Sequence, residues 1–392
     1  MKGAKTMWDG RRDRPTVAQI NLACIAHNIQ AIRKVTGPDC EILGIVKADA
    51  YGHGVIPVAR TALDNGASWL GVALIEEGIA LRKSGIIAPI LVVAQLFPAQ
   101  AQAALRYNLS CTVATYEFAE ALSNAAVKEG KRAKCHIKID TGMGRIGLHP
   151  DQTVNFVKHI AMLPNIEIEG LFTHLATAEE EDKTFLYKQL SLFNDATEAL
   201  RRNGIQAKYY HAANSVAAIT TPEARLDIVR PGIFMYGFTP LYGERADQIK
   251  AEIGIVPALS IRTKVGFVKR CPAGTPIGYG GTYITHKEST IVTLPIGYAD
   301  GFPRALSNCG EVIIKGNRFP VVGRVCMDEC MVCVGDADVH MGNEAIIIGK
   351  QGTKEITAEE IAEKIGTVAH DVLCGISGRV PRIYRYEVWD PF

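Results

Sequence analysis

Residues 41–66 read EILGIVKADAYGHGVIPVARTALDNG, and this stretch sets the pattern that decides the fold. The short apolar run EILGIVK (41–47) is typical of a buried strand, and a glycine-containing turn follows it. In VIPVARTALDNG (55–66) apolar residues recur at spacings of three and four up to a glycine, as in an amphipathic helix that ends there. The stretch therefore predicts one strand, a loop and one helix.

The same unit recurs along the chain up to about residue 235. Further strand-like runs alternate with helical patterns, and they lie at 69–74, 89–94, 109–114, 133–140, 166–173, 207–212 and 225–230. Eight strands that alternate with helices predict an α/β fold of the (β/α)8, or TIM-type, barrel class. An open doubly wound sheet uses the same units, so the preference for a barrel rests first on the count of eight.

The sequence after residue 250 is different, because short β-rich segments such as EAIIIGK (344–350) are separated by Gly, Pro and Asn turns. One helix is expected at 357–366, where Thr357 and Glu360 would form a capping box. We therefore expect an N-terminal tail (1–15), a barrel domain (16–245) and a mostly β C-terminal domain (246–392). The first strand-like run (16–22) is a candidate to pair with that second domain.

The composition indicates a globular protein, with 47% hydrophobic and 21% charged residues. A formal net charge of +2 and the lack of any Lys/Arg-rich stretch argue against a nucleic-acid partner. The N-terminal residues contain no apolar run typical of a signal peptide, and no segment reaches ~18 uninterrupted apolar residues. We expect a cytoplasmic protein with no membrane partner, and a solvated tail around Arg11, Arg12 and Arg14.

The ten cysteines are scattered through strand-like and helical segments, so reduced thiols are expected rather than disulfides. The densest group is Cys326, Cys330 and Cys333. A zinc site would need a fourth ligand at a nearby spacing, and the sequence offers neither a CxxC pair nor an HxxxH pair there. We interpret these three as core cysteines on a strand and predict no metal.

In a barrel of this class the functional groups gather at the C-terminal ends of the strands. Polar residues lie at the ends of the predicted strands or in the loops that follow them: Lys47 ends the first, Arg145 follows the fifth, His174 ends the sixth, the seventh runs into His211, Asn214 and Ser215, and Arg230 ends the eighth. Each of them has an ordinary structural explanation when taken alone. Their coincidence on one predicted rim is what indicates a site.

The residue types on this rim suit an anionic cofactor with an aldehyde group. Ser215 and the backbone amides of Gly232 and Ile233 lie in the loops that usually bind phosphate in such barrels. A lysine at the end of an apolar strand is partly desolvated, which favours the neutral amine that forms a Schiff base. Arg230 is the candidate partner of a pyridine nitrogen.

The segment TGMGRIG (141–147) permits another interpretation, because it also fits the GxGxxG pattern of dinucleotide sites. It follows a strand, and Glu169 lies about twenty residues further on. However, His149 and Pro150 delay the helix that should begin inside the glycine run, and the strand is the fifth of the series. The dinucleotide hypothesis is therefore the less favoured one.

Several motifs in register resemble the bacterial alanine racemases. The resemblance covers about residues 16–385 and rests on IVKADAYGHG (45–54), KIDTGMGRIG (138–147), FTHLATA (172–178), HAANS (211–215), VRPGIFMYG (229–237), YGGTY (279–283), LPIGYADGF (294–302), VGRVCMDECM (322–331) and ISGRVPRIY (376–384). The motif around Lys47 resembles the cofactor-lysine motif of that family.

The resemblance implies a pyridoxal 5'-phosphate enzyme that interconverts L- and D-alanine as a head-to-tail homodimer. Racemisation needs a base on each face of the substrate α-carbon. By resemblance Lys47 would hold the cofactor and act on one face, while Tyr279 of the partner would act on the other.

The resemblance also assigns expected roles to the remaining residues. The cofactor would be bound by Tyr51, His174, Asn214, Ser215, Arg230, Gly232 and Ile233, the substrate by Arg145, Met327 and Tyr298, and Lys138 matches a lysine that is N-carboxylated in some members.

One residue departs from the family pattern and keeps alternatives open. Gly378 stands where many members carry a side chain, a tyrosine in some, that lines the pocket. The glycine predicts a looser pocket and measurable turnover of serine. A racemase with another main substrate, such as serine or lysine, is one alternative. A barrel-type decarboxylase and a protein that only binds the cofactor are the others.

Overall fold

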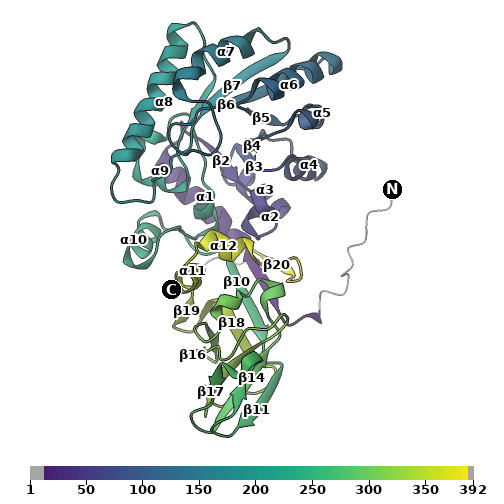
Figure 1. The fold of residues 1–392 in the computed structure, drawn as a ribbon, viewed down its shortest axis with the longest axis vertical. Coiled ribbons are helices and arrows are strands. Elements are labelled where there is room, and N and C mark those ends of the chain that lie inside the picture. Colours follow the sequence, from purple (N-terminus) through teal and green to yellow (C-terminus); the bar gives the residue numbers. More distant parts are fainter. Residues whose placement is uncertain (1–12, 387–392) are drawn as a thin grey trace. The chain divides into compact units, whose positions relative to one another are not determined.

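The computed structural model of the protein describes residues 13–386, and they divide into two compact units. The first, here called the barrel unit, comprises residues 25–235 and 251–255. The second, here called the β unit, comprises residues 13–24, 236–250 and 256–386. Figure 1 draws most of the barrel unit in purple to teal and most of the β unit in green to yellow.

The barrel unit contains eight parallel strands in the order β8-β7-β6-β5-β4-β3-β2-β9. Their bounds are β2 (Glu41–Ile45), β3 (Trp69–Val72), β4 (Ile90–Gln95), β5 (Ser110–Val113), β6 (Ala133–Lys138), β7 (Ile166–Phe172), β8 (Tyr209–His211) and β9 (Ile228–Val229). Each coincides with a strand-like run of the sequence, although β4 extends one residue beyond its run, to Gln95. The predicted (β/α)8 barrel is confirmed.

The last two strands of the barrel are shorter than expected. Leu226 adopts a positive φ of 49°, which ends extended backbone before Ile228. The sheet nevertheless continues from β8 towards β9, because the amide of Asp227 donates to the Tyr210 carbonyl (3.0 Å) and that of Arg230 to the Ala213 carbonyl (3.1 Å). These bonds bring the seventh and eighth rim segments together.

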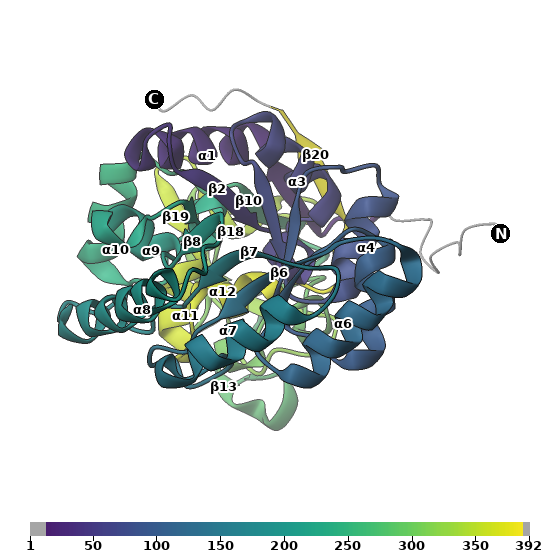
Figure 2. The same cartoon turned by 90° about the horizontal axis from the view of Figure 1, so that it is seen from above.

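Helices surround the strands, as the view in Figure 2 shows. They are α1 (Leu22–Thr36), α2 (Lys47–Tyr51), α3 (Val55–Asp64), α4 (Ile75–Lys83), α5 (Ala101–Arg106), α6 (Tyr116–Glu129), α7 (Thr153–Met162), α8 (Thr184–Arg202) and α9 (Ser215–Thr220). In α6 the Thr115 side chain accepts from the amide of Phe118, and Gly130 ends the helix at φ 62°. The boundaries of α6 therefore follow the capping residues of its sequence.

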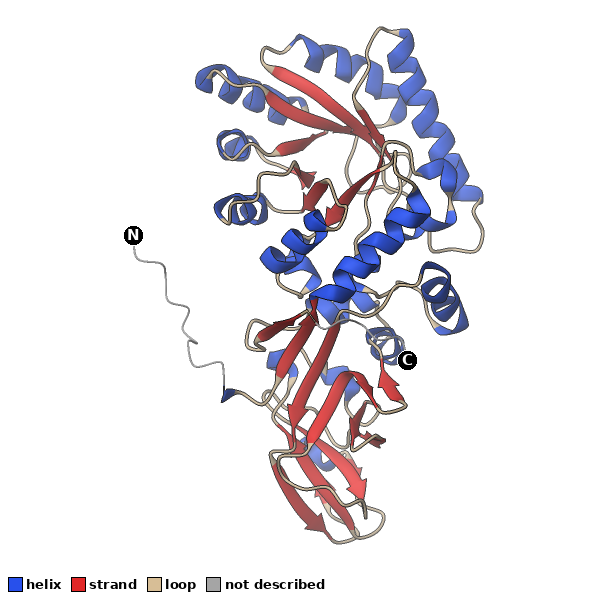
Figure 3. Cartoon of the chain, turned by 180° about the vertical axis from the view of Figure 1, so that it is seen from behind, coloured by secondary structure: helices blue, strands red, loops and turns tan. Residues whose placement is uncertain are grey.

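The β unit is built mostly from strands, as Figure 3 shows in red. They are β1 (Val17–Asn21), β10 (Leu259–Lys264), β11 (Phe267–Cys271), β12 (Pro276–Ile277), β13 (Tyr283–Ile284), β14 (Ser289–Leu294), β15 (Glu311–Ile314), β16 (Asn317–Pro320), β17 (Cys330–Gly335), β18 (Glu344–Gln351), β19 (Lys354–Ile356) and β20 (Arg382–Arg385). Strand β1 pairs antiparallel with β10 and parallel with β20. The remaining helices are α10 (Gly243–Ile253), α11 (Ala358–Ile365) and α12 (Ala369–Cys374).

The expected helix at 357–366 forms as α11, with Thr357 accepting from the amide of Glu360 (3.0 Å). The Glu360 carboxylate, however, pairs with Arg318 and with Lys364 (2.9 Å). Only the Thr357 half of the expected capping box therefore forms, because two cations offer the Glu360 carboxylate stronger partners than one backbone amide.

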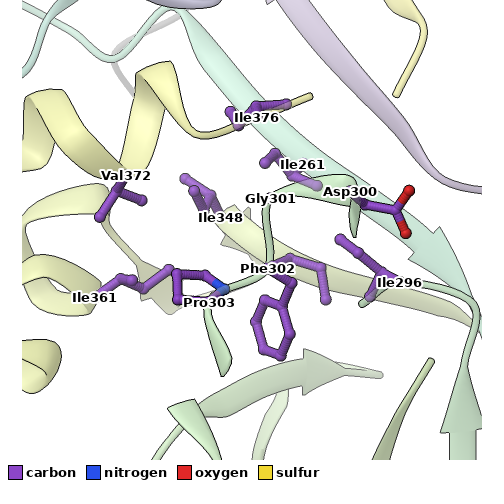
Figure 4. A pocket seen from close by; sticks show the side chains of 11 residues that line it. Ile261, Ile296, Asp300, Gly301, Phe302, Pro303, Ile348, Ile361, Val372 and Ile376 are labelled. Carbon is purple, nitrogen blue, oxygen red and sulfur yellow. The ribbon is translucent and has the colours of Figure 1, made fainter. Parts of the chain in front are cut away.

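Arg14 is not part of a solvated tail, so this expectation was wrong for that residue. Its guanidinium lies 2.7 Å from the carboxylate of Asp300, which is 1% exposed, and Arg379 contacts the same carboxylate at 3.4 Å. Figure 4 shows this aspartate beside a small apolar cavity between Phe302, Ile348 and their neighbours, with its carboxylate turned away from them. Arg11 and Arg12 lie outside the described residues.

Across residues 13–386, no helix is long and apolar enough to cross a membrane. The ten cysteines are free thiols, and the described part of the chain holds no cluster of three or more His, Cys, Asp or Glu side chains that could bind a metal. Cys330 is buried and Cys333 half-buried on β17, whereas Cys326 precedes that strand. The interpretation as strand cysteines was therefore wrong for Cys326.

Two glycines with nearly equal φ allow the cost of a side chain to be separated into strain and overlap. A Cβ at Gly237 (φ 78°) would lie 1.8 Å from the backbone oxygen of Val256, whereas one at Gly254 (φ 76°) would meet nothing within 4 Å. We expect Gly254→Ala to lower the free energy of unfolding by about 1 kcal/mol and Gly237→Ala by at least about 3 kcal/mol. Urea denaturation measures both values, and equal losses would contradict the overlap.

Candidate active site

Lys47 follows β2 by two residues and begins a left-handed turn. Four consecutive non-glycine residues, Ala48, Asp49, Ala50 and Tyr51, have φ between 52° and 54°. Such backbone costs roughly 1–2 kcal/mol per residue for L-amino acids, and a run of strained residues is typical of functional sites. The strained turn fixes the direction in which the chain leaves the strand and so the position of Lys47.

Two carboxylates hold the strained turn. Glu77 in α4 accepts from the amide of Ala48 (2.6 Å) through Oε1 and from those of Ala73 (2.8 Å) and Leu74 (3.0 Å) through Oε2. Asp49 accepts from the amide of Val55 (2.8 Å), which ties the end of the turn to the start of α3. Glu77 is not evident as a site residue from the sequence, because a glutamate in the first turn of a helix is an ordinary helix-start residue.

Tyr51, Ser215 and Gly232 converge on one place. A Cβ on Gly232 would lie 2.6 Å from the Tyr51 hydroxyl oxygen, so that hydroxyl lies directly over the glycine backbone. The Gly232 amide donates to Ser215 Oγ at 2.8 Å. Two hydroxyls and a backbone N–H therefore surround a position that only glycine leaves open, and Ile233 follows it. Asn214 caps α9 by accepting from the Ala217 amide (3.0 Å).

Arg230 is a buried cation held by neutral acceptors. Nη2 donates to the carbonyls of Thr173 (2.8 Å) and Ala212 (2.9 Å), and Nη1 to His211 Nδ1 (3.0 Å). Nη2 also lies 3.4 Å from His174 Nδ1. Burial lowers the pKa of Arg230 to about 9, so the guanidinium remains charged at neutral pH. Since arginine has five N–H groups, one on Nη1 and the Nε–H remain for a ligand.

Positive charge gathers around Arg230. Burial, followed by repulsion from Arg230 and Arg145, holds the pKa of Lys138 well below its usual range. The Lys138 Nζ lies 4.2 Å from the centre of the Phe172 ring. Burial and the charges of Arg230, Lys138, Arg145 and Lys47, in that order, also depress the pKa of His174 strongly. This rim therefore suits an anion.

The glycine-rich loop after β6 does not have the shape of a dinucleotide site. Asp140 accepts from the amides of Gly142 (3.0 Å) and Gly144 (3.1 Å). The chain then returns beside β6, where the Leu148 amide donates to the Lys138 carbonyl (2.9 Å), and α7 begins only at Thr153. The loop presents the exposed Arg145. The dinucleotide hypothesis is not supported, because no helix begins in the glycine run.

Three of the expected site residues belong to the β unit. Tyr279, Tyr298 and Met327 are 70%, 43% and 52% exposed. The loops of Tyr298 and Met327 are joined, because the Tyr298 amide donates to the Cys326 carbonyl (3.0 Å) and a Cβ on Gly297 would lie 2.3 Å from the Met327 carbonyl oxygen. The loop of Tyr279 meets the same segment, since a Cβ on Gly323 would lie 2.6 Å from the Ile277 carbonyl oxygen.

Both units of the chain match known protein families. The family model described as "Alanine racemase, N-terminal domain" matches residues 20–240, and the model described as "Alanine racemase, C-terminal domain" matches residues 258–384. The chain belongs to the alanine racemase family. The alanine racemase of Halothermothrix orenii is 44% identical over 379 residues, which are 96% of this chain and 99% of that protein.

Solved structures of the family have the same fold. An alanine racemase of Clostridium difficile 630 is similar with a TM-score of 0.89 and 39% identity, covering 95% of this chain and 96% of that one. The alanine racemase of Bacillus anthracis with bound L-Ala-P has a TM-score of 0.88 and 37% identity, covering 96% of both chains. The family resemblance read from the sequence is confirmed.

The role of Glu77 can be tested on the strained turn. Replacing Glu77 with alanine leaves three backbone amides without their acceptor, so we expect the free energy of unfolding to fall by about 2–3 kcal/mol. Glu76→Ala removes an exposed carboxylate from the same helical turn and should change it by less than about 0.5 kcal/mol. Chemical denaturation of both variants measures this, and similar losses would refute the anchoring role.

Proposed function

We propose that the protein interconverts L- and D-alanine with pyridoxal 5'-phosphate as its cofactor. The observation that carries this proposal is the cluster of Lys47, Tyr51, Ser215, Arg230 and Gly232 on the C-terminal rim of a (β/α)8 barrel in a chain of the alanine racemase family. The relative with bound L-Ala-P supports a site for an alanine-like ligand.

The residues fit the cofactor. The Tyr51 and Ser215 hydroxyls and the backbone at Gly232 and Ile233 would hold its phosphate, where a Cβ would leave no room. The free N–H groups of Arg230 would meet its pyridine nitrogen, with His174 and Asn214 beside them. The cofactor, when bound in this site, would supply the electron withdrawal that acidifies the substrate α-carbon.

Two bases then perform racemisation. The Lys47 Nζ would take or return the α-proton on one face. Tyr279 Oη of a partner subunit would act on the opposite face. Its 70% exposure in the single chain, together with that of Tyr298 and Met327, supports a head-to-tail homodimer with shared sites.

Arg145 and the backbone at the partner's Met327 would bind the substrate carboxylate. Lys138 would carry an N-carboxylate, because a neutral amine among cations is nucleophilic and the resulting carbamate would pair with Arg145. A carbamate signal in the 13C NMR spectrum after exposure to labelled bicarbonate checks this, and a Lys138→Met protein must lack it.

A decarboxylase is not favoured, since such barrel enzymes typically place a glutamate at the pyridine nitrogen and this chain has Arg230. A cytoplasmic location agrees with the lack of a membrane-spanning helix within residues 13–386 and with the ten free thiols.

The first test is loss of optical rotation from L-alanine, L-serine and L-lysine incubated with cofactor-replete protein. We expect fast decay for alanine, slower decay for serine and none for lysine. No decay with any of the three, in a protein that carries its cofactor, would reject the proposed racemase.

The substrate range should depend on Gly378. This exposed residue has nothing within 4 Å of its Cβ position, so a side chain fits without strain in the single chain. We expect Gly378→Tyr to lower kcat/KM for serine by about tenfold or more relative to alanine, because it restores a wall of the pocket. Gly378→Ala is the control, and an unchanged ratio in the tyrosine variant would contradict the open pocket.

Subunit mixing tests the shared site. Lys47→Ala and Tyr279→Phe should each be nearly inactive, yet a heterodimer of the two has one intact site. After exchange in equal amounts we expect about a quarter of the wild-type activity. No recovery, with exchange demonstrated by mass spectrometry, would show that Tyr279 does not act across a dimer.

A further inference from the structure

Four buried side chains form a continuous hydrogen-bonded chain inside the barrel. Arg230 Nη1 lies 3.0 Å from His211 Nδ1, His211 Nε2 lies 2.9 Å from His136 Nδ1, and His136 Nε2 lies 3.3 Å from Glu169 Oε2. Both histidines are fully buried, Glu169 is 4% exposed and Arg230 is 5% exposed. Glu169 also accepts from Ser110 Oγ (2.7 Å) and Lys134 Nζ (2.8 Å).

The two ends of this chain fix the direction of every hydrogen bond in it. A guanidinium can only donate, so His211 Nδ1 accepts and its proton lies on Nε2. That Nε2–H donates to His136 Nδ1, which places the proton of His136 on Nε2 as well. A carboxylate can only accept, so Glu169 completes the series. Both histidines are therefore neutral and held in one tautomer.

A β-bulge and a glycine make room for this series of hydrogen-bonded side chains. The pairing of β6 with β7 shifts between Cys135 and His136, so that Cys135 faces Ile168 and His136 faces Gly170, and Glu169 is the extra residue. A bulge of this kind re-aims a side chain. A Cβ on Gly170 would lie 2.3 Å from His136 Nδ1, so only glycine leaves room for the imidazole.

The charge states of these side chains agree with the directions of their hydrogen bonds. Burial, the largest effect, lowers the pKa of His136 and strongly lowers that of His211, which keeps both rings neutral. Burial opposes ionisation of Glu169, but the hydrogen bonds from His136, Lys134 and Ser110 outweigh it and lower its pKa to about 2. A carboxylate thus lies at one end and a guanidinium at the other, with two polarised imidazoles between them.

We propose that Glu169 and His136 are positioning residues for Arg230, which they hold through His211 as a fixed donor towards the cofactor's pyridine nitrogen. This inference rests on the proposed function. If His136 offered no acceptor, His211 could turn or change tautomer and present an N–H to the guanidinium. Arg230 would then lose its Nη1 acceptor and its fixed orientation.

The first experiment compares His136→Asn with His136→Leu in the full-length protein. Both side chains branch at Cγ, but only asparagine places an oxygen where Nδ1 was. In 15N-histidine NMR spectra we expect His211 to keep its Nε2–H tautomer in the asparagine variant and to lose it in the leucine variant. The same tautomer in both variants, or its loss in both, would overturn the proposal.

The second experiment measures alanine kinetics with the cofactor bound. We expect kcat to fall about tenfold to a hundredfold in His136→Leu and less than about threefold in His136→Asn. KM for alanine should change less than about twofold in both, because the substrate carboxylate is bound elsewhere. A fall confined to KM would contradict a role at the pyridine nitrogen.

Glu169→Gln tests the charged end without depending on the folding of the His136 variants. The amide oxygen still accepts from His136, but the negative charge is lost, so we expect kcat to fall several-fold with KM unchanged. Glu167→Gln removes a carboxylate that lies on the same strand but takes no part in the hydrogen-bonded series, and this variant should have wild-type kcat. Equal kcat in the two variants would refute the role of Glu169.

The tautomer readout needs no cofactor, so it separates failure of this inference from failure of the proposed function.

Discussion

The burial of the Arg230 guanidinium without a carboxylate in contact is the constraint on which the site depends. Carbonyls of Thr173 and Ala212 and a neutral histidine accept its protons. A direct carboxylate would neutralise the charge and consume the N–H groups that a ligand needs. The counter-charge of Glu169 is instead placed two imidazoles away, which stabilises the cation and leaves the rim positive. That rim can then accept an anionic cofactor and an anionic substrate.

Strain in the backbone is the second requirement of the same rim. The left-handed turn after Lys47 is unfavourable for L-residues, and the hydrogen bond from the Ala48 amide to Glu77 offsets part of that cost. The amides of Ala73 and Leu74 hold the same carboxylate in place. The turn also brings the Tyr51 hydroxyl over Gly232, so one local distortion positions two functional groups. Arg230 and the strained turn thus arrange opposite parts of the proposed cofactor site by different means, one electrostatic and the other conformational.

The site residues expected in the β unit are exposed, whereas Arg230 of the barrel unit is buried. Close backbone approaches at Gly297 and Gly323 join three loops, and these loops carry Tyr279, Tyr298 and Met327. Exposed aromatic and methionine side chains on a rigid support are typical of surfaces that bind a partner. In the proposed dimer they would complete the site that the barrel begins.

The sequence by itself determined the barrel, because periodicity and capping residues are local, and the motifs around Lys47 and Arg230 identified the family. It also predicted a common rim for the polar residues, since they lie at strand ends or in the loops after them, although His211 is the last, fully buried residue of β8. It could not reveal Glu77, His136 or Glu169 as partners, because their contacts join residues 29, 75 and 33 positions apart in sequence. The pairing of Arg14 with Asp300 was hidden for the same reason. Only the tertiary structure decided these pairings. They depend on a bulge in β7 and on a glycine packed against an imidazole, and both are contacts between segments that no local sequence pattern encodes.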